Sequence, residues 1–301
     1  MTGDRYDPPP VAVRAAVAAA LAEDFGPLGD VTSLALVPSG ATGRGRFVAR
    51  SAGVLAGTAC ATEVFAQLDP AVVVTWHAAD GRALAAGACF GAAAGPTRSL
   101  LGGERSALNF LGHLSGIATL TRAYVDAAGP GTRIRETRKT LPGLRALEKA
   151  AVRAGGGANH RGGLSDAVLV KDNHLRIASV ADAVAAARSC WPGMVVEVEC
   201  DTLDQVAQAR EAAADLILLD NMTPDEVAKA AVLTRDVPGL LIEVSGGVTL
   251  DAVAAYAAAG ADLISVGALT HSAPNLDLAF DLDPLLAAEA GDPLLAAEAG
   301  D

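Results

Sequence analysis

From about residue 119 onward, short runs containing β-branched residues alternate with alanine-rich stretches of helical periodicity. The runs cover 133–137, 167–170, 195–198, 216–219, 241–244 and 263–266, and the helices expected between them cover 180–188, 203–213, 224–233 and 250–259. From residue 167 onward the runs recur every 20–29 residues or so, which is roughly the length of a βα unit in a parallel sheet. The near-continuous apolar character indicates strands buried on both faces. The pattern predicts an incomplete, TIM-like parallel α/β barrel over residues 117–274.

Residues 1–116 have a different pattern, with apolar segments interrupted by glycines. An Asp80-Gly81 pair within the segment 72–87 predicts the turn of a β-hairpin. We expect a smaller N-terminal α/β sandwich domain here, with a helix over 104–122 at its end. A C-terminal helix over 275–301 is expected to join this domain. Within that helix the nine residues 283–291 are repeated letter for letter, which we interpret as a duplication without functional content.

Polar residues or glycines follow the apolar runs. In a parallel α/β barrel the chemistry collects at the carboxyl ends of the strands. The residues at those ends are Arg138, Lys139, Lys171, Glu199, Asp220, Ser245, Gly246, Gly247 and Gly267. The period of two along a strand places Glu197 on the same face as Glu199, one layer deeper. A barrel with a purely structural role has no reason to carry so many polar groups on one rim.

Residues 133–171 form a basic segment in an acidic protein. They include nine lysines and arginines against three acids, whereas the whole chain has a formal net charge of −12. Nucleic-acid binders usually spread basic charge over a larger surface. The aromatic content of 4% also argues against base stacking on single strands. A confined cationic segment predicts instead a pocket for a small, highly anionic ligand.

Each candidate site residue could have a structural role instead of a functional one. Arginine recognises carboxylates and phosphates with two parallel hydrogen bonds, whereas lysine supplies a compact charge, but each cation of the segment could also pair with a surface acid. Glu199 and Asp220 could hold sugar hydroxyls, ligate Mg²⁺ or stabilise a developing positive charge. Their alternative is a structural ion pair with Lys171 or Arg138.

The later strands offer candidates for phosphate binding. Ser245-Gly246-Gly247 and Gly267 present backbone amides of the kind that form anion sites, although glycine turns are common. His271 could donate to phosphate or act as a general acid, with a structural role as the alternative. His113, on an apolar helix face, is expected to be structural.

Cysteine spacing and hydropathy bear on the compartment. The four cysteines form no CxxC pair and no zinc-site spacing, so we expect free thiols in a reducing cytoplasm. The apolar stretch 11–21 is short and contains Arg14, so we expect no membrane span.

Several motifs together resemble one enzyme family. They are ETRKTLPGLR at 136–145, GGG and NHR within 155–161, LSD at 164–166, KDNH at 171–174, EVE at 197–199, LDNM at 219–222 and EVSGG at 243–247, with ED at 23–24, GDVTS at 29–33 and ERSALN at 104–109 upstream. In this order they resemble quinolinate phosphoribosyltransferases, also called nicotinate-nucleotide pyrophosphorylases (carboxylating). The resemblance covers nearly the whole chain except the first residues and the repeated tail.

The resemblance implies an activity and a set of acceptor-binding residues. The family transfers phosphoribosyl from phosphoribosyl pyrophosphate to quinolinate in NAD biosynthesis, releasing pyrophosphate and CO₂ and giving nicotinate mononucleotide. Arg138, His160 and Arg161 would hold the two quinolinate carboxylates. Family members are dimers or larger, up to a hexamer of dimers, and Arg105 would reach into the neighbouring subunit's site.

The resemblance also implies how the donor is bound. Lys139 and Lys171 would contact the phosphoribosyl donor. Glu199 and Asp220 would hold ribose hydroxyls, directly or through Mg²⁺, and would offset the charge that grows on the anomeric carbon. The phosphate would be bound by Ser245, Gly246, Gly247, Gly267 and His271.

Three other functions remain open at this point. A homologue of the same fold, associated with molybdenum transport, would use another acceptor. A nicotinate phosphoribosyltransferase would bind a monocarboxylate, which does not require so many arginines. A non-catalytic barrel could bind an anionic metabolite as a sensor or assembly module, but such a protein would not need both Glu199 and Asp220.

Overall fold

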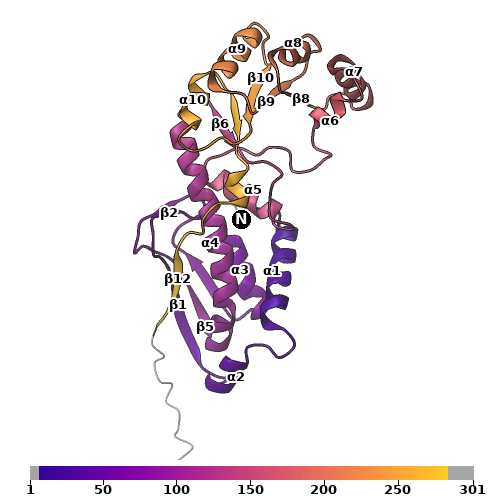
Figure 1. Ribbon diagram of the computed structural model, residues 1–301. Coiled ribbons are helices and arrows are strands. Elements are labelled where there is room, and N and C mark those ends of the chain that lie inside the picture. The colour runs from indigo at the N-terminus through magenta and orange to yellow at the C-terminus, as the bar shows by residue number, and fades with distance from the viewer. Residues whose placement is uncertain (1–6, 284–301) are drawn as a thin grey trace, which may run out of the picture.

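The structure is a computed structural model that describes residues 7–283. It consists of two stacked units (Figure 1). The lower unit contains a four-stranded antiparallel sheet and the upper unit a six-stranded parallel sheet. Helix α4 (Thr97–Ala128) extends from the lower unit into the upper one. It is longer than the expected helix over 104–122, and the expected domain boundary at 116/117 lies inside it.

The antiparallel sheet has the strand order β12-β1-β5-β3. Its strands are β1 (Thr42–Ala49), β3 (Val73–Trp76), β5 (Cys89–Pro96) and β12 (Leu278–Leu282). The other elements of this unit are α1 (Pro10–Phe25), α2 (Val31–Leu36), α3 (Thr58–Leu68) and the short pair β2 (Gly53–Val54) and β4 (Ala83–Leu84). Five aromatic side chains, Phe47, Phe65, Trp76, Phe90 and Phe280, pack together in the core of this unit.

Strand β12 corrects the expected C-terminal helix. Residues 278–282 pair antiparallel with β1, with Phe47 opposite Phe280, and Figure 1 shows β12 beside β1. The reason is tertiary: the Phe47 and Phe280 rings lie 4.7 Å apart in the aromatic core, and an extended segment returning along β1 places Phe280 there. The rest of the expected helix, residues 284–301 with the second copy of the repeat, lies outside the described residues.

The expected hairpin at Asp80-Gly81 is also wrong. Gly81 has a left-handed φ of 87°, so a turn is present. The flanking strands do not pair with each other, however, because β3 pairs with β5 and β4 pairs with β2. Asp80 instead accepts a hydrogen bond from the backbone amide of Gly57 at 2.8 Å.

The upper unit confirms the predicted incomplete parallel barrel. Its sheet order is β6-β11-β10-β9-β8-β7, and within residues 7–283 the two ends of this order, β6 and β7, do not pair. The strands are β6 (Arg133–Arg135), β7 (Val168–Val170), β8 (Val196–Cys200), β9 (Leu216–Asp220), β10 (Leu241–Ser245) and β11 (Leu263–Ser265). All six predicted apolar runs therefore form strands, shifted by at most two residues at either end.

Helices pack around this sheet. They are α7 (Val180–Cys190), α8 (Leu203–Glu211), α9 (Pro224–Thr234) and α10 (Val253–Ala258). The loops after the strands also contain α5 (Arg145–Ala154) and the four-residue helices α6 (Asp172–Leu175) and α11 (Ala268–His271). The side chains of Thr202 and Thr223 cap α8 and α9 by accepting from backbone amides in the first turn. Helix α10 begins three residues later than predicted, after a turn.

The two units are joined by close backbone packing. The segment before β12 crosses α4, where a methyl group at Gly116 would collide with the carbonyl oxygen of Pro274. Leu276 N donates to Gly112 O at 2.9 Å on the same helix. The chain can therefore leave the barrel after α11 and return to the N-terminal sheet only because small residues on α4 leave room for it.

Candidate active site

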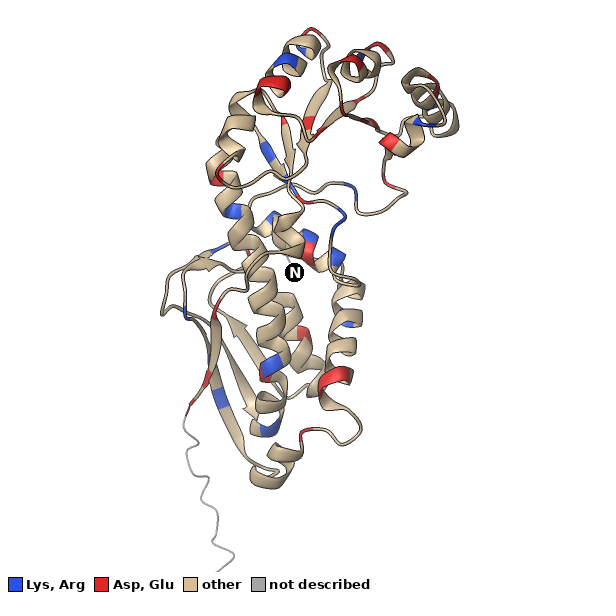
Figure 2. Cartoon of the chain, in the orientation of Figure 1, with Lys and Arg blue, Asp and Glu red and all other residues tan. Residues whose placement is uncertain are grey.

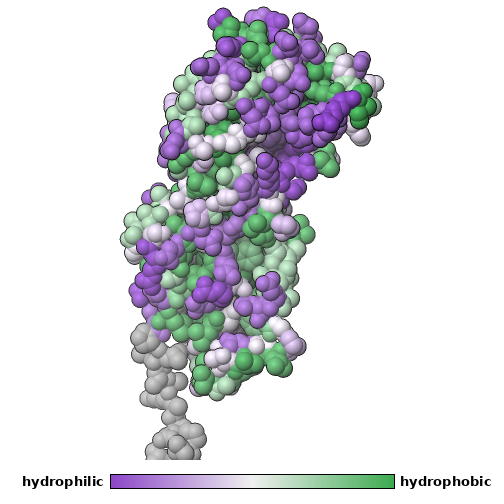
Figure 3. Space-filling view, in the orientation of Figure 1, coloured by the Kyte–Doolittle hydropathy of each residue, from purple (hydrophilic) through white to green (hydrophobic). Residues whose placement is uncertain are grey.

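A pocket of about 400 Å³ opens at the carboxyl ends of the barrel strands. Each strand of the parallel sheet contributes a residue at or just beyond its end: Arg138, Lys171, Glu199, Asp220, Ser245 and Ser265. The remaining lining residues are Thr137, Lys139, His160, Arg161, Leu169 and Leu218. Figure 2 shows lysines and arginines on the loops between the barrel and the lower unit, and Figure 3 shows hydrophilic residues concentrated in this region.

The loop after β6 presents Arg138 and Lys139, and Arg145 at the start of α5 fixes this loop. Arg145 donates to Thr140 Oγ1 at 3.0 Å, to Arg138 O at 3.3 Å and to Gly162 O at 3.0 Å. One guanidinium therefore ties the loop carrying Arg138 to the loop carrying Arg161. Among residues 7–283, Arg138 Nε is buried and has no hydrogen-bond partner, which leaves it available to an anion.

Arg161 lines the same pocket as Arg138. Its Nη1 donates to Ala167 O at 3.2 Å. Burial lowers the pKa of Arg161, and the neighbouring positive charge of Arg138 lowers it further. The two guanidinium groups therefore repel each other, and an anion bound in the pocket would relieve that repulsion.

Two carboxylates from adjacent strands face these cations. Glu199 forms an ion pair with Lys171 Nζ, which is the structural alternative considered for it. Asp220 accepts a hydrogen bond from Asn221 Nδ2 at 2.8 Å. Burial raises the pKa of Asp220, and the negative charge of Glu199 raises it further. The Lys171 side chain remains 44% exposed, so its pairing with Glu199 does not close the pocket.

The carboxylate pair also has the donor chemistry for a divalent cation. Magnesium prefers oxygen ligands and is usually held by one or two carboxylates together with substrate phosphates. Glu199 and Asp220 line the same pocket, and their mutual repulsion would be reduced by a cation. These residues therefore fit Mg²⁺.

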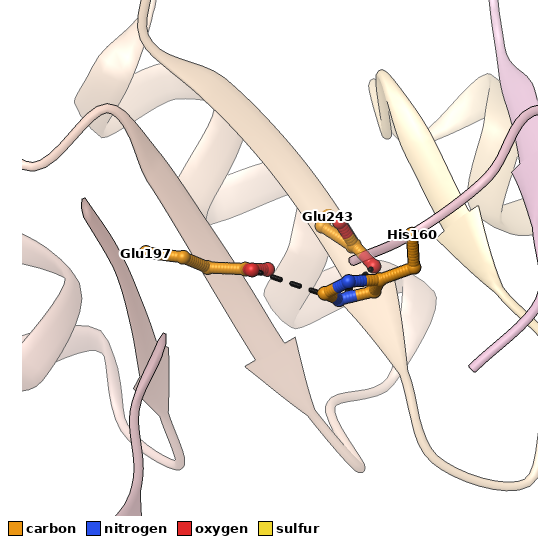
Figure 4. Close-up of side chains that lie close together, drawn as sticks. All are labelled: His160, Glu197 and Glu243. Atoms are coloured by element: carbon orange, nitrogen blue, oxygen red, sulfur yellow. Dashed lines mark ion pairs between the residues drawn. The ribbon is translucent and has the colours of Figure 1, made fainter. Parts of the chain in front are cut away.

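His160 lines the pocket and contacts two buried acids on the inner face of the barrel (Figure 4). His160 Nε2 lies 3.4 Å from Glu243 Oε1 and 3.6 Å from Glu197 Oε2. Arg135 Nη1 donates to Glu243 Oε2 at 2.5 Å, and Ser265 Oγ donates to Glu243 Oε1. The prediction that Glu197 lies one layer below Glu199 is confirmed, since Glu197 is only 2% exposed.

Sequence reasoning missed Glu243 and Ser265 as parts of this network. Counting back by two from Ser245 places Glu243 on the same inner face, so the signal was present. Ser265 carried no such signal, because a serine within a strand is ordinary. Thr137, which also lines the pocket, was missed for the same reason.

Of the predicted phosphate-binding residues, only Ser245 is in the lining of the pocket. Gly246 has a φ of 100° and packs against Asn221, so that a side chain there would collide with Asn221 Oδ1. A Cβ at Gly267 would lie 3.2 Å from both Lys139 Cδ and His271 Nε2. His271 is exposed, and its Nδ1 lies 2.7 Å from Ser272 Oγ.

Other cations of the segment 133–171 have internal partners. Lys149 forms a buried ion pair with Glu136, and Arg153 donates to Asn159 Oδ1 at 2.7 Å. Arg135 pairs with Glu243 on β10, outside the segment. These three cations therefore have partners inside the protein, and none of them lines the pocket. His113 Nε2 contacts Glu148 Oε1 at 2.9 Å, in keeping with a structural role.

Arg105 stands apart from the pocket of its own chain. It lies on α4, is exposed to solvent and is absent from the pocket lining.

Two family models match the chain and together cover residues 30–281. Residues 30–115 match the N-terminal domain of quinolinate phosphoribosyl transferase, and residues 117–281 match its C-terminal domain. The chain belongs to this family. It is 44% identical over 277 residues to the nicotinate-nucleotide pyrophosphorylase [carboxylating] of Mycobacterium leprae, covering 90% of this chain and 97% of that protein. The probable Bacillus subtilis enzyme is 43% identical over 263 residues, with 86% and 90% coverage.

Solved structures give the same result. The nicotinate-nucleotide pyrophosphorylase from Francisella tularensis superposes with a TM-score of 0.88 at 37% identity, covering 94% of this chain and all of that one. Human nicotinic acid phosphoribosyltransferase has a TM-score of 0.56 at 16% identity, covering 91% of this chain and 74% of that chain, and so shares the fold alone. None of the helices in residues 7–283 combines the length and the apolar character needed to cross a bilayer.

Proposed function

We propose that this protein transfers phosphoribosyl from phosphoribosyl pyrophosphate to quinolinate, with loss of CO₂, to give nicotinate mononucleotide for NAD biosynthesis. The observation that carries the proposal is the convergence of four cations and two carboxylates, from strands far apart in the sequence, on one pocket. Family membership and the relatives' names support the same reaction.

Quinolinate carries two adjacent carboxylates. Arg138 and Arg161, which line the same pocket, would bind them with charge-assisted hydrogen bonds. The ring nitrogen then attacks the anomeric carbon, the N–C1′ bond forms, and the C1′–O bond to pyrophosphate breaks. Orientation of the nitrogen by the two arginines would supply much of the rate enhancement.

The donor would lie against the opposite wall. Lys139 and Lys171 would neutralise its phosphates, and Glu199 and Asp220 would hold the ribose hydroxyls and stabilise the positive charge that develops at C1′. The 5′-phosphate would be bound near Ser245, Gly246, Gly247, Gly267 and His271. We also propose that Glu199 and Asp220 hold Mg²⁺, which would neutralise the leaving pyrophosphate.

Decarboxylation needs no further catalytic group in this scheme. Once the ring nitrogen is bonded to ribose it carries a positive charge. That charge stabilises the electron pair left on the adjacent carbon when its carboxylate departs as CO₂. The carbanion then takes up a proton at the same carbon.

The test is a product assay with purified protein, phosphoribosyl pyrophosphate, Mg²⁺ and quinolinate. We expect stoichiometric pyrophosphate and nicotinate mononucleotide. Nicotinate in place of quinolinate is the control acceptor, because it lacks one carboxylate, and it should react far more slowly. Pyrophosphate release with nicotinate but not with quinolinate would refute the proposal.

We propose further that the protein is at least a dimer, that Arg105 completes the partner subunit's quinolinate site, and that it acts in the cytoplasm. The exposure of Arg105 outside its own pocket supports a role in trans. Arg105→Ala and Lys139→Ala would each inactivate a homodimer. Mixing the two variants under exchange conditions should restore activity, because some hybrids then hold one intact site. Absence of restored activity in verified hybrids would contradict the shared site.

A further inference from the structure

His160 lies in the pocket wall, but its polar atoms are directed into the protein. The backbone N–H of Arg161 donates to His160 Nδ1 at 2.7 Å. Because Nδ1 accepts a hydrogen bond, it carries no hydrogen, and a neutral ring must therefore carry its hydrogen on Nε2. Nε2 faces Glu243 and Glu197 on the floor (Figure 4). The side chain is only 8% exposed.

The backbone of His160 is held as firmly as its ring. Lys149 Nζ donates to His160 O at 2.7 Å, and the His160 amide donates to Glu136 Oε1 at 3.1 Å. Residue 160 is thus fixed from β6 through Glu136 and from α5 through Lys149.

The charges around the ring oppose its protonation. Burial, the largest cause, and the positive charges of Arg135, Lys149, Arg161 and Lys171 together lower the pKa of His160 to about 3. The two acids that face Nε2 do not reverse this balance. Glu243 is already paired with Arg135 at 2.5 Å, and burial together with the negative charge of Glu243 raises the pKa of Glu197, which favours its uncharged form. Burial also raises the pKa of Glu243, which makes that acid a weaker attraction for a second cation.

The resemblance implied that His160, together with Arg138 and Arg161, holds the quinolinate carboxylates directly. We propose instead that His160 is a neutral positioning residue: its Nε2 faces Glu243 and Glu197, and its Nδ1 accepts from the Arg161 amide and so sets the direction in which Arg161 meets the acceptor. The effect of this positioning role on quinolinate binding rests on the proposed function. The charge at the acceptor site then comes from arginine and lysine alone.

The side chains of His160, Glu197 and Glu243 also have the composition of a metal site, since their ligand atoms lie within 4.8 Å of one another. The structure favours the positioning role, because Glu243 already has Arg135 and Ser265 as hydrogen-bond partners. The surrounding cations repel a metal ion as they repel a proton on the ring.

The decisive measurement is ¹⁵N NMR of the full-length protein labelled at its five histidines, with the His160 signals assigned by their absence in His160→Asn. We expect a ring with Nδ1 unprotonated and Nε2 protonated, unchanged between about pH 5.5 and 8.5 and unchanged by quinolinate, whereas an ordinary exposed histidine titrates near 6.5. A His160 that titrates in this range, or that becomes doubly protonated with quinolinate, would overturn the proposal. This measurement requires no turnover, so its outcome is independent of whether quinolinate is the substrate.

Kinetics of matched variants test the consequence. His160→Asn keeps an acceptor, Oδ1, near the place of Nδ1 and carries no charge, whereas His160→Leu has no acceptor. We expect KM for quinolinate to stay within about threefold in the Asn variant and to rise about tenfold or more in the Leu variant, the effect of one lost hydrogen bond. Equal losses in both variants, or a wild-type KM that rises as pH passes 6.5, would indicate a cationic clamp.

Discussion

The two sheets of this protein use their buried faces in opposite ways. The inner face of the N-terminal sheet is filled by aromatic rings, with Phe47 in contact with Phe65, Trp76, Phe90 and Phe280. The inner face of the barrel instead carries Glu197, Glu243, Arg135 and Ser265, of which the two glutamates are at most 2% exposed. Parallel barrels are ordinarily filled by branched apolar side chains, so the barrel, not the N-terminal sheet, departs from the rule.

The difference shows where stability and function are located. Apolar burial stabilises the N-terminal unit directly. A buried ionic network costs desolvation, and apolar replacements of the same volume are often neutral or stabilising. A polar barrel floor is therefore expected where it supports chemistry, and here it lies directly beneath Arg138, Arg161 and Glu199. Substitutions in the two units should separate stability from catalysis.

The largest effect on stability is expected in the aromatic core. Phe47 is fully buried, and its replacement by alanine leaves a large cavity, so Phe47→Ala should lower the free energy of unfolding by about 3–5 kcal/mol. Urea denaturation followed by circular dichroism measures this. The kcat/KM of the fraction that remains folded should be unchanged. A loss of kcat/KM comparable to that of a pocket variant would erase the contrast between the two units.

Substitutions at the pocket should affect catalysis strongly and stability only slightly. Lys139→Ala and Arg161→Ala should each lower kcat/KM for quinolinate by the equivalent of roughly 2–5 kcal/mol, the usual effect of removing a desolvated charged contact. Their unfolding free energies should change far less. Arg46→Ala is the matched control, because Arg46 is 53% exposed and pairs only at the surface with Asp283, where such pairs contribute about 0–1 kcal/mol. Wild-type kcat/KM in a well-folded pocket variant would refute its assigned role.

Acid should weaken the barrel floor more than the N-terminal core. The pKa of His160 is about 3 in the folded chain and 6.5 in its ordinary state, so the unfolded chain takes up the proton first as pH falls. The contribution of His160 to stability is therefore complete above about pH 6.5 and is lost as pH falls toward 3. Between pH 7.5 and 5, wild type should lose about 1–2 kcal/mol more than His160→Asn, measured by denaturant titration. If wild type and His160→Asn lost the same unfolding free energy between these pH values, His160 would not contribute to the pH dependence of stability.

The smallest effect concerns the N-terminal unit. Asp30 Oδ1 accepts from the amides of Thr32 and Ser33 at 3.1 and 3.0 Å and so caps helix α2. Asp30→Ala should cost about 1 kcal/mol, and Asp30→Asn, which keeps the acceptor, should cost less. Hydrogen exchange of the α2 amides measures the local effect. Activity loss in Asp30→Ala beyond its loss of stability would place α2 in the functional site and weaken the comparison.

The local sequence pattern was sufficient to predict many of the residues that line the pocket. The period of two and the placement of polar residues after apolar runs assigned the strand ends, so that Arg138, Lys171, Glu199, Asp220 and Ser245 were expected on one rim and do line one pocket. Parallel strands force this result, because their carboxyl ends all meet at the same edge.

Contacts between distant segments could not be predicted in this way. Nothing in the local sequence of residues 278–282 predicts a strand. The segment becomes one because Phe280 packs on Phe47 when it pairs with β1. The Asp80-Gly81 turn is real, but the partners of its flanking strands were decided by β5 and β2. Hydrogen-bonding partners within a sheet depend on which strands become neighbours, and that choice is made by burial of the whole core.

The amino-acid sequence alone therefore determined the barrel, its reactive rim and the family. Only the tertiary structure decided how His160 is used, since its ring meets Glu197 and Glu243 from other strands and Arg135 neutralises one of them across 108 positions of sequence. The physical reason is that the charge state of a side chain depends on desolvation and on neighbours brought together by folding. Neither can be predicted from the residues adjacent to it in the sequence.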